Sequence, residues 1–466
     1  MDRLLEGVEV TGTRGDVAGT EVTSLELDSR AVTPGALFFC LPGHRSDGHD
    51  HAPDAVERGA VGLMVERPLD LDVAQVVVAP GTARRSMALL AATFYDHPAR
   101  SLLTVGVTGT NGKTSVTHLL ASILDSHGQP CAVIGTLDGE RTTPEAPVVQ
   151  RLLDEARRRH RAAVAMEVSS HALTEGRVDG IRFDAAVFTN LGRDHLDHHV
   201  TMERYFAAKA SLFTEERAAL AVVNADDPWG GRLLEQIAIP AVTFGAGDAT
   251  DVETGPGCTT FMWRGRKVEL ALTGAYHVAN AVAAAATATA LGVPDDTVVQ
   301  GLGAARALPG RFEPVDVPAP FTVVVDYAHT PDGLAVALDS ARRLAGSARV
   351  VCVFGCGGDR DRDKRPLMAD VVSRQADVTV ITSDNPRHED PAAIIDDVVG
   401  GVVEGAEVVI EPDRARAIGR AVALARPGDV VLVAGKGHES VIEIGDRRVP
   451  FDDALVAADA VRRVAP

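Results

Sequence analysis

The segment LLTVGVTGTNGKTSVTHLLASILD (102–125) decides the fold of this chain. It opens with an apolar run of strand length and continues, after a turn, with apolar residues three and four positions apart, as in a helix with one buried face. The turn holds Gly109 and Gly112 in the pattern G-x-x-G-K-T. Backbone N–H groups of such a turn, together with the helix N-terminus, form a cradle for anions. We therefore predict a nucleotide phosphate site, with Lys113 on the terminal phosphates and Thr114 on Mg²⁺.

This phosphate loop departs from the usual pattern in one respect. The position five residues before Gly112, where a standard loop has glycine, is Val107, so the pattern is a shortened one. The alternative interpretation is a glycine-rich turn with a surface lysine. The order of strand, turn, G-K-T and amphipathic helix favours the phosphate loop.

Strand-like and helical stretches alternate outward from this loop. Apolar runs at 162–168, 185–191 and 220–225 are separated by helical stretches, which predicts a mostly parallel sheet covered on both faces. Beyond LPGRFEPV (308–315), the runs TVVVDY, RVVCVFG, DVTVITS and DVVLVAG each end in a polar or glycine-rich loop. Right-handed crossovers place those loops at one edge of a sheet, where open α/β folds bind ligands. With 466 residues, we expect three domains, at 1–100, 101–311 and 312–466.

Composition narrows the class of protein. The formal net charge is −19, from 46 basic and 65 acidic residues, which disfavours a general nucleic-acid binder. The five cysteines show no C-x-x-C pairing, so reduced thiols are expected rather than a zinc site or disulfides. No signal-peptide core or run of 18 apolar residues occurs, which predicts a cytoplasmic protein without membrane insertion.

Two further residues point to a metal-dependent site, and a third is unusual in its surroundings. Glu167 closes a buried strand in MEVSSHAL, where a carboxylate is not expected as packing. His195 in RDHLDHH (193–199) follows another strand end on the side of the phosphate loop. Lys209 lies on the apolar stripe of MERYFAAKASLF (202–213), where an unpaired ammonium is costly unless its stem reaches solvent. Together, Glu167 and His195 fit ligands of magnesium bound to a nucleotide. Histidine is an unusual ligand for that ion, which favours a specialised second metal.

Taken together, the motifs resemble the Mur ligases and, within them, the MurE group. The resemblance rests on TGTNGKTS, MEVSSHAL, TNLGRDHLDHH, AAKASLF, LPGRFE, DYAHTPDGL and GKGHE, and it runs from LDSRAVTPGALF (27–38) to the C-terminus. It implies an α/β protein with three domains: an N-terminal domain that binds the UDP end of the substrate, a central ATP-binding domain of the P-loop type with a parallel sheet, and a Rossmann-like C-terminal domain that binds an amino acid.

The resemblance also implies a reaction. ATP phosphorylates the γ-carboxylate of D-glutamate in UDP-MurNAc-L-Ala-D-Glu, and the amine of an amino acid attacks the acyl phosphate, as a step of peptidoglycan precursor synthesis. Lys113, Lys209, His195 and Glu167 are the implied catalytic residues. Two Mg²⁺ ions are implied: Thr114 and Glu167 would hold the ion bound to the nucleotide, and His195 would hold the second. Lys209 would carry an N6-carboxy group (a carbamate) that approaches the metal as an anion.

Further residues are assigned by matching motifs. The implied ATP-binding residues are Gly109, Thr110, Asn111, Gly112, Lys113, Thr114, Ser115, Asn280, Arg311, Asp326 and His329. The implied UDP-substrate residues are Ser29, Arg30, Gly43, His44, Thr142, Thr143, Ser169 and Arg177, with Gly43 and His44 in the stretch GHRSDG. One departure concerns His277, which replaces the asparagine usual near the adenine.

The loop DNPR (384–387) discriminates between amino acids. It resembles members of the family that add meso-diaminopimelate, and lysine-adding members lack its arginine. Diaminopimelate has one more carboxylate than lysine, and Arg387 offers a bidentate partner for it. The implied diaminopimelate-binding residues are Arg360, Asp384, Asn385, Arg387, Gly435 and Glu439. The alternative role of Arg387 is an ion pair with Glu389 or Asp390.

Other functions remain open at this point. A MurE-type ligase for L-lysine and a folylpolyglutamate synthetase-like ligase share the phosphate loop and carboxylate activation, while a catalytically silent ATP-binding scaffold is a non-enzymatic alternative. The DSR motif at 28–30 and DNPR argue against the folate enzyme, and intact Lys113, Glu167, His195, Lys209 and Arg387 argue against the scaffold. The expected partners are the UDP-linked dipeptide, ATP and diaminopimelate, with no nucleic acid, and a monomer is expected.

Overall fold

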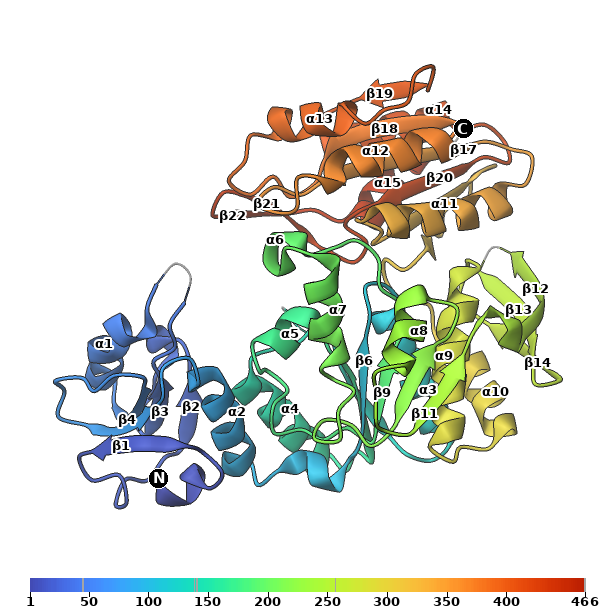
Figure 1. The fold of residues 1–466 in the computed structure, drawn as a ribbon. Coiled ribbons are helices and arrows are strands. Elements are labelled where there is room, and N and C mark those ends of the chain that lie inside the picture. The colour runs from blue at the N-terminus through green and yellow to red at the C-terminus, as the bar shows by residue number, and fades with distance from the viewer. Residues whose placement is uncertain (44–45, 138, 140, 256, 465–466) are drawn as a thin grey trace.

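The computed structural model describes residues 1–43, 46–137, 139, 141–255 and 257–464. Its three large sheets follow one another along the chain, and Figure 1 shows them in three regions coloured blue, green to yellow, and orange to red. The predicted α/β architecture with parallel sheets is confirmed. Within these residues, no helix combines the length and apolar character needed to cross a membrane.

The N-terminal region is built on a five-stranded sheet of order β1-β5-β4-β3-β2. Strands β2 to β5 pair in parallel and β1 joins β5 antiparallel. Its elements are η1 (Asp2–Leu5), β1 (Val10–Arg14), β2 (Ser24–Glu26), η2 (Ser29–Ala31), β3 (Ala36–Phe39), η3 (Gly48–His51), α1 (Ala52–Glu57), β4 (Ala60–Val65), β5 (Ala74–Val78), α2 (Ala83–Phe94) and η4 (Pro98–Ser101).

The central region contains a six-stranded parallel sheet of order β11-β10-β9-β6-β8-β7. Its elements are β6 (Leu103–Thr108), α3 (Lys113–Ser126), β7 (Cys131–Ile134), α4 (Ala146–Arg158), β8 (Ala163–Glu167), α5 (Ser170–Thr174), β9 (Ala185–Phe188), α6 (Leu196–His199), α7 (Met202–Ala210), β10 (Ala221–Asn224), α8 (Pro228–Leu234), β11 (Ala241–Phe244) and η5 (Ala246–Asp248). The phosphate-loop strand β6 lies between β8 and β9, so the segments after all three strands meet at one edge.

Two parts of the central region differ from expectation. The helix that carries Lys209 ends at Ala210, so Leu212 and Phe213 lie beyond it, although both are buried. A three-stranded antiparallel sheet, which the sequence analysis did not foresee, precedes α9 (Tyr276–Ala290) and α10 (Asp295–Ala304). Its strands are β12 (Ala249–Gly255), β13 (Cys258–Trp263) and β14 (Arg266–Leu270).

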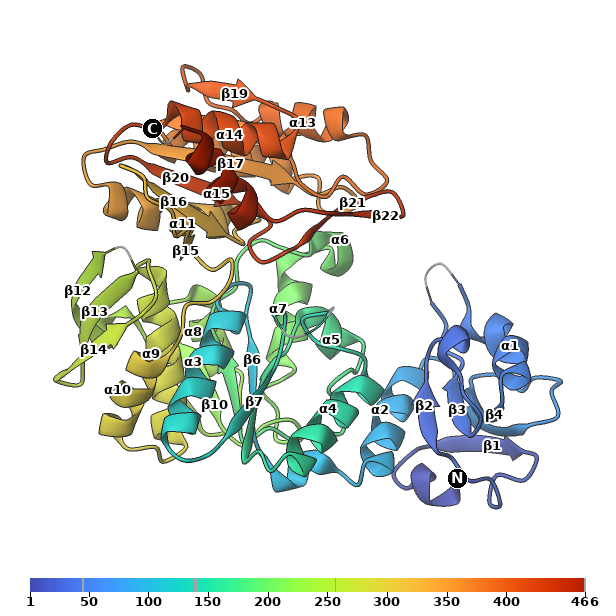
Figure 2. The same ribbon diagram turned by 180° about the vertical axis from the view of Figure 1, so that it is seen from behind.

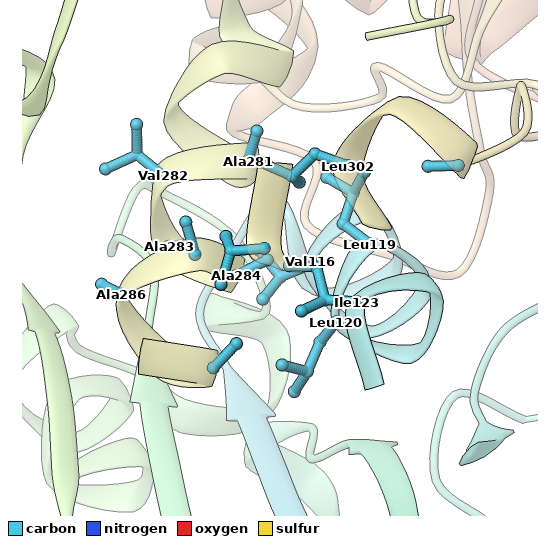
Figure 3. Close-up of a cluster of buried hydrophobic side chains, with 14 of the residues drawn as sticks. Val116, Leu119, Leu120, Ile123, Ala281, Val282, Ala283, Ala284, Ala286 and Leu302 are labelled. Carbon is cyan, nitrogen blue, oxygen red and sulfur yellow. The ribbon is translucent and has the colours of Figure 1, made fainter. Parts of the chain in front are cut away.

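Small side chains allow α9 to pack closely on α3. Figure 3 shows Ala281 and Ala284 on the side of α9 that faces Val116 and Leu120 of α3. Gly301 of α10 lies so near the backbone of Ile123 that a Cβ atom would collide with it. This packing holds the helix that begins at the phosphate loop against the helix that carries Asn280.

The C-terminal region has a six-stranded sheet of order β15-β16-β20-β17-β18-β19, parallel except for β15. Its elements are β15 (Glu313–Pro314), β16 (Thr322–Asp326), α11 (Pro331–Ala345), β17 (Val350–Cys356), α12 (Lys364–Gln375), β18 (Val378–Ser383), α13 (Pro391–Val399), β19 (Val408–Ile410), α14 (Arg414–Leu424), β20 (Val430–Ala434), the hairpin β21 (Val441–Ile444) and β22 (Arg447–Pro450), and α15 (Asp453–Val464). Figure 2 shows the hairpin at the side of this region that faces α6.

A buried ion pair joins α14 to α15. Nε and Nη2 of Arg414 each donate to Asp453 at 2.7 Å, and both side chains are at most 1% exposed. Removing one partner leaves the other charge buried, so we expect Arg414→Met to lower the free energy of unfolding by about 3–5 kcal/mol in urea titrations. The double variant R414M/D453L should recover most of that loss, and a single variant as stable as the parent would contradict the prediction.

Candidate active site between the central and C-terminal regions

The phosphate loop has the backbone that its sequence requires. Gly109 and Gly112 adopt φ values of +150° and +88°. A Cβ atom at these positions would collide with Thr189 and with Asn280, respectively, so glycine is needed for both reasons. Asn111 donates its N–H to Asn190 Oδ1 at 2.9 Å, which ties the loop to the segment after β9. Asn190 belongs to the quoted motif TNLG, but the sequence analysis did not single it out.

Lys113 folds back over the loop. Its Nζ donates to the carbonyl oxygens of Gly109 and Thr110, each at 3.0 Å. Burial lowers the pKa of Lys113, and the nearby Glu167 carboxylate opposes that shift. Thr114 begins the next turn, and its hydroxyl accepts from Nη2 of Arg311 at 2.9 Å. A residue from the end of the central region therefore already contacts the predicted phosphate site.

Glu167 lies one strand away from the loop. It pairs with Val107 in the register of β6 and β8, and its side chain is 1% exposed. Its two carboxylate oxygens accept from the backbone N–H and the hydroxyl of Thr136, at 2.8 and 3.2 Å. Sequence reasoning missed Thr136, because its segment carries no motif. These contacts hold a carboxylate beside the phosphate loop.

His195 occupies the residue before the one-turn helix α6, in the left-handed conformation with φ +55°. Burial lowers the pKa of His195 to about 3, which leaves the ring neutral at physiological pH. Asp194 supports it, with a carboxylate oxygen 3.4 Å from Nε2. A neutral imidazole keeps a lone pair for a metal ion.

Lys209 lies beneath the loop and is 1% exposed. Its Nζ donates to the carbonyl oxygen of Gly109 at 2.8 Å, the same oxygen that Lys113 contacts, and lies 4.7 Å from the centre of the Tyr205 ring. Burial, reinforced by the positive charge of Lys113, holds the pKa of Lys209 well below its usual value. The amine is therefore shifted toward its neutral, nucleophilic form.

A cavity of about 470 Å³ collects most of these residues. Its lining includes Thr110 to Ser115, Glu167, His195 and Asn280, together with Arg311, Asp326 and His329. The structure thus brings the predicted ATP-binding residues together, apart from Gly109, which lies in the same loop. Lys209 and the fully buried His277 do not line it, and His277 Nε2 lies 3.2 Å from the Arg311 carbonyl oxygen. His277 therefore does not face this cavity, and its expected effect on contacts with the adenine stays a prediction.

The central and C-terminal regions meet around this cavity. Asp326 accepts from Phe312 N–H at 2.7 Å and from the Tyr276 hydroxyl at 3.0 Å. The carboxylate of Asp194 lies 3.8 Å from His329 Nε2 and 3.6 Å from Lys364 Nζ. Tyr276 and Lys364 were not predicted as site residues.

A second cavity, of about 740 Å³, lies at the N-terminal region. Two of the predicted UDP-substrate residues, Ser29 and Arg30, line it, together with Arg84, Arg141 and Glu145, which the sequence analysis did not single out. Gly43 is exposed and does not line it, and His44 lies outside the described residues.

The segment 141–145 connects the two cavities. Arg141 and Glu145 line the second one, whereas Thr142 lines the first. The Thr143 hydroxyl donates to the Glu167 carbonyl oxygen at 2.8 Å, and the Thr143 carbonyl oxygen accepts from Arg177 at 2.9 Å. Ser169 donates its N–H to the Thr143 hydroxyl at 3.0 Å. The four predicted residues Thr142, Thr143, Ser169 and Arg177 therefore lie together.

The predicted amino-acid residues gather after β18 and β20. Asn385 Nδ2 donates to Glu439 at 2.8 Å, and a Cβ atom at Gly435 would lie 2.8 Å from Asp384. Lys436, which was not predicted, is fully buried and donates to Asn385 at 3.0 Å and to Glu439 at 2.9 Å.

Arg387 and Arg360 border that group. Arg387 pairs with Glu443 at 2.9 Å, whereas Glu389 pairs with Arg365, so the alternative of an Arg387 ion pair with Glu389 or Asp390 is wrong. Arg360 is exposed, and a Cβ atom at Gly357 would lie 3.0 Å from Arg387 Nη1 and 4.0 Å from Arg360 Cγ. Both arginines therefore flank Gly357.

The donor set of the 470 Å³ cavity can be compared with the needs of magnesium. In the part of the chain that is described, no three His, Cys, Asp or Glu side chains are grouped to hold a metal ion. Magnesium in nucleotide sites is commonly held by one or two carboxylates, water and substrate phosphates. The Glu167 carboxylate and the Thr114 hydroxyl, which line this cavity together with neutral His195, fit that requirement.

Three family models match the chain in order. They are the Mur ligase family catalytic domain at residues 21–102, the Mur ligase middle domain at 107–288 and the Mur ligase glutamate ligase domain at 310–437. The chain belongs to the Mur ligase family. The resemblance found in the sequence is thus confirmed, and so is a ligase with the three-part α/β architecture of that family.

Individual relatives cover nearly the whole chain. A UDP-N-acetylmuramoyl-L-alanyl-D-glutamate--2,6-diaminopimelate ligase from Geobacillus thermodenitrificans is 47% identical, with 95% of each chain covered. The ligase of the same name from Geobacillus kaustophilus is 46% identical at the same coverage. A solved structure of a ligase with this name is 32% identical, covers 95% of each chain and superposes with a TM-score of 0.64.

Proposed function

We propose that this Mur ligase adds meso-diaminopimelate to the D-glutamate γ-carboxylate of UDP-MurNAc-L-Ala-D-Glu, with ATP as the second substrate. The observation that carries the proposal is the cavity in which the phosphate loop, Glu167 and His195 face Asp326 and His329 of the C-terminal region. Relatives with this name over 95% of their length support the same reaction. The enzyme acts as a monomer in the cytoplasm, with domains at 1–100, 101–311 and 312–466.

Carboxylate activation is the first chemical task. A carboxylate is a poor electrophile, so transfer of the γ-phosphoryl group to one of its oxygens supplies a leaving group. Two anions must approach each other in this step, and positive charge must offset their repulsion. Lys113 and the N–H groups at the start of α3 hold the phosphates, and Arg311, which already contacts Thr114, lies on the same wall.

Thr114 and Glu167 would hold the Mg²⁺ of the nucleotide, and His195 would hold a second Mg²⁺. When bound, the metal neutralises charge on the phosphates and on the attacking carboxylate. The neutral Lys209 amine attacks carbon dioxide, forms a C–N bond and releases a proton, which turns the side chain into an anionic carbamate. This change suits Lys209 because its pKa is lowered and its position is closed to solvent.

Amide formation completes the reaction. The amine of diaminopimelate attacks the acyl phosphate, and the tetrahedral intermediate collapses with loss of phosphate. Arg387 binds the carboxylate that lysine lacks, while Glu439, supported by Lys436 and Asn385, binds an ammonium group. Arg360, Asp384 and Gly435 complete the wall, and Ser29, Arg30, Gly43, His44, Thr142, Thr143, Ser169 and Arg177 hold the UDP-linked dipeptide.

Phosphate release tests the proposal directly. Purified protein is given ATP, Mg²⁺ and the UDP-linked dipeptide, with diaminopimelate, with L-lysine or with no amino acid. We expect sustained phosphate release only in the reaction that contains diaminopimelate. Equal release with lysine contradicts the amino-acid assignment, release with a pteroyl substrate indicates the folylpolyglutamate reaction, and no release under any condition indicates a silent scaffold.

A further inference from the structure

The hairpin β21–β22 holds the backbone of the DNPR loop. Arg387 has a left-handed conformation with φ +49°, which is uncommon for a residue other than glycine. Its N–H donates to the Glu443 carbonyl oxygen at 3.0 Å, and its carbonyl oxygen accepts from Gly445 N–H at 2.6 Å. The hairpin therefore fixes the point from which the arginine side chain extends.

The same hairpin orients the guanidinium group. Nε of Arg387 donates to Glu443 Oε2 at 2.9 Å, and Nη1 donates to the Gly358 carbonyl oxygen at 2.9 Å. Two contacts at different nitrogens fix the plane of this rigid, planar group. Neither contact uses Nη2, and each terminal nitrogen carries two hydrogens. The Nη1–Nη2 edge thus keeps donors for a second carboxylate.

Glu443 also contacts the neighbouring residue of the site. Its N–H donates to Asn385 Oδ1 at 3.0 Å, and that oxygen also accepts from Lys436. With both donors on the oxygen, the Asn385 amide nitrogen is directed to Glu439. Glu443 is therefore bonded to two elements of the candidate amino-acid site, although it belongs to no motif that we identified in the sequence.

We infer that Glu443 is a positioning residue that sets selectivity for a dicarboxylate amino acid by aiming Arg387. The side chains of Arg387 and Glu443 are 21% and 28% exposed, so their mutual attraction contributes modestly to folding. Its effect lies in geometry: an arginine already held in one plane receives the substrate carboxylate without losing further rotational freedom. This inference rests on the proposed diaminopimelate reaction and adds a residue to it.

Steady-state kinetics of the full chain test this role. For Glu443→Ala we expect KM for diaminopimelate to rise about tenfold, with kcat and KM for ATP within about twofold of the parent, because a charge-assisted contact that orients Arg387 is lost. Glu443→Gln keeps an oxygen that accepts from Nε, so its KM should stay within about threefold. The ratio of kcat/KM for diaminopimelate to that for lysine should fall only in the alanine variant.

A double variant separates positioning from a general structural effect. If Glu443 acts through Arg387, R387A/E443A should be no worse than R387A alone. Arg447→Ala, an exposed change on the same hairpin, is the matched control and should behave as the parent. If the alanine variant melts at a lower temperature than the parent, Glu443→Thr repeats the test, because threonine is favoured in β-strands.

The outcomes that overturn the inference are distinct from failure of the proposed function. An unchanged or lowered KM for diaminopimelate in both E443A and E443T, or additive losses in the double variant, contradicts a positioning role. A parent protein that makes no product with diaminopimelate contradicts the proposed function itself.

Discussion

Lys209→Ala should lower kcat by about 10²–10³-fold, the range found when one electrostatic contact to a transition state is removed. The native amine is closed to solvent and shares the Gly109 carbonyl oxygen with Lys113. An ammonium at this position would repel Lys113 and any nearby metal, whereas a carbamate reverses that sign. Alanine cannot form the carbamate, so the negative charge that would offset Lys113 and a nearby metal ion is lost. Rates of phosphate release measure the effect.

Chemical rescue distinguishes a lost carbamate from a damaged fold. A small carboxylate such as formate, added to the alanine variant, should restore part of the rate because it can occupy the vacated space as an anion. Mass spectrometry of the parent, kept in bicarbonate, should find one added carbon dioxide on the peptide that contains Lys209. Lys267→Ala, which removes an exposed lysine of β14, is the matched control. Full activity of the unrescued Lys209 variant would remove the carbamate from the mechanism.

The parts of the fold that were predictable share a local cause. Strand β6, the two glycines and the amphipathic start of α3 occupy adjacent positions, so period and turn chemistry identify them without tertiary information. Glu167 and Lys209 were detectable for a different reason: each places a charge where its own strand or helix pattern requires an apolar residue. The structure agrees with that signal, because both side chains are only 1% exposed.

The parts that were missed depend on contacts between distant segments. Arg311 reaches Thr114 across 197 positions, and Glu443 reaches Arg387 across 56. No periodicity or spacing encodes such a pair. Thr114, Arg311 and Arg387 lie in motifs, but a motif does not name the residue that its side chain will contact, and Glu443 lies in none. The same limit explains the wrong alternative for Arg387: Glu389 is near in sequence, but the loop directs it to Arg365. Nearest acidic neighbours along the chain are therefore poor guides to ion pairs in loops.

Placement of a residue near a ligand is also decided by packing. His277 follows Tyr276 at the start of α9, and the two adjacent side chains point in different directions: Tyr276 lines the 470 Å³ cavity, whereas His277 is fully buried. A motif predicts the helix on which a residue lies, but it does not predict which of two adjacent side chains faces the cavity. That orientation depends on what packs against the other side of the helix. Here the His277 ring contacts the Arg311 carbonyl oxygen through Nε2.

Arg387→Ala should lower kcat/KM for diaminopimelate by about 10²–10³-fold while leaving affinity for ADP unchanged. A site built to pair a substrate charge discriminates strongly, because a buried carboxylate without its partner is costly. Arg387 is already held by Glu443 and Gly358, and neither of these contacts uses Nη2. The loss should be larger for diaminopimelate than for lysine, since lysine has no carboxylate at that end.

Two measurements decide whether Arg387 recognises substrate or maintains the loop. Kinetics with both amino acids give the selectivity, and ADP titration by calorimetry reports on the phosphate site. Arg416→Ala serves as the control for loss of positive charge in this region, because the Arg416 side chain is 71% exposed. Equal losses with diaminopimelate, lysine and ADP would mean that Arg387 maintains the loop, because a residue that recognises only one carboxylate affects only the substrate that carries it.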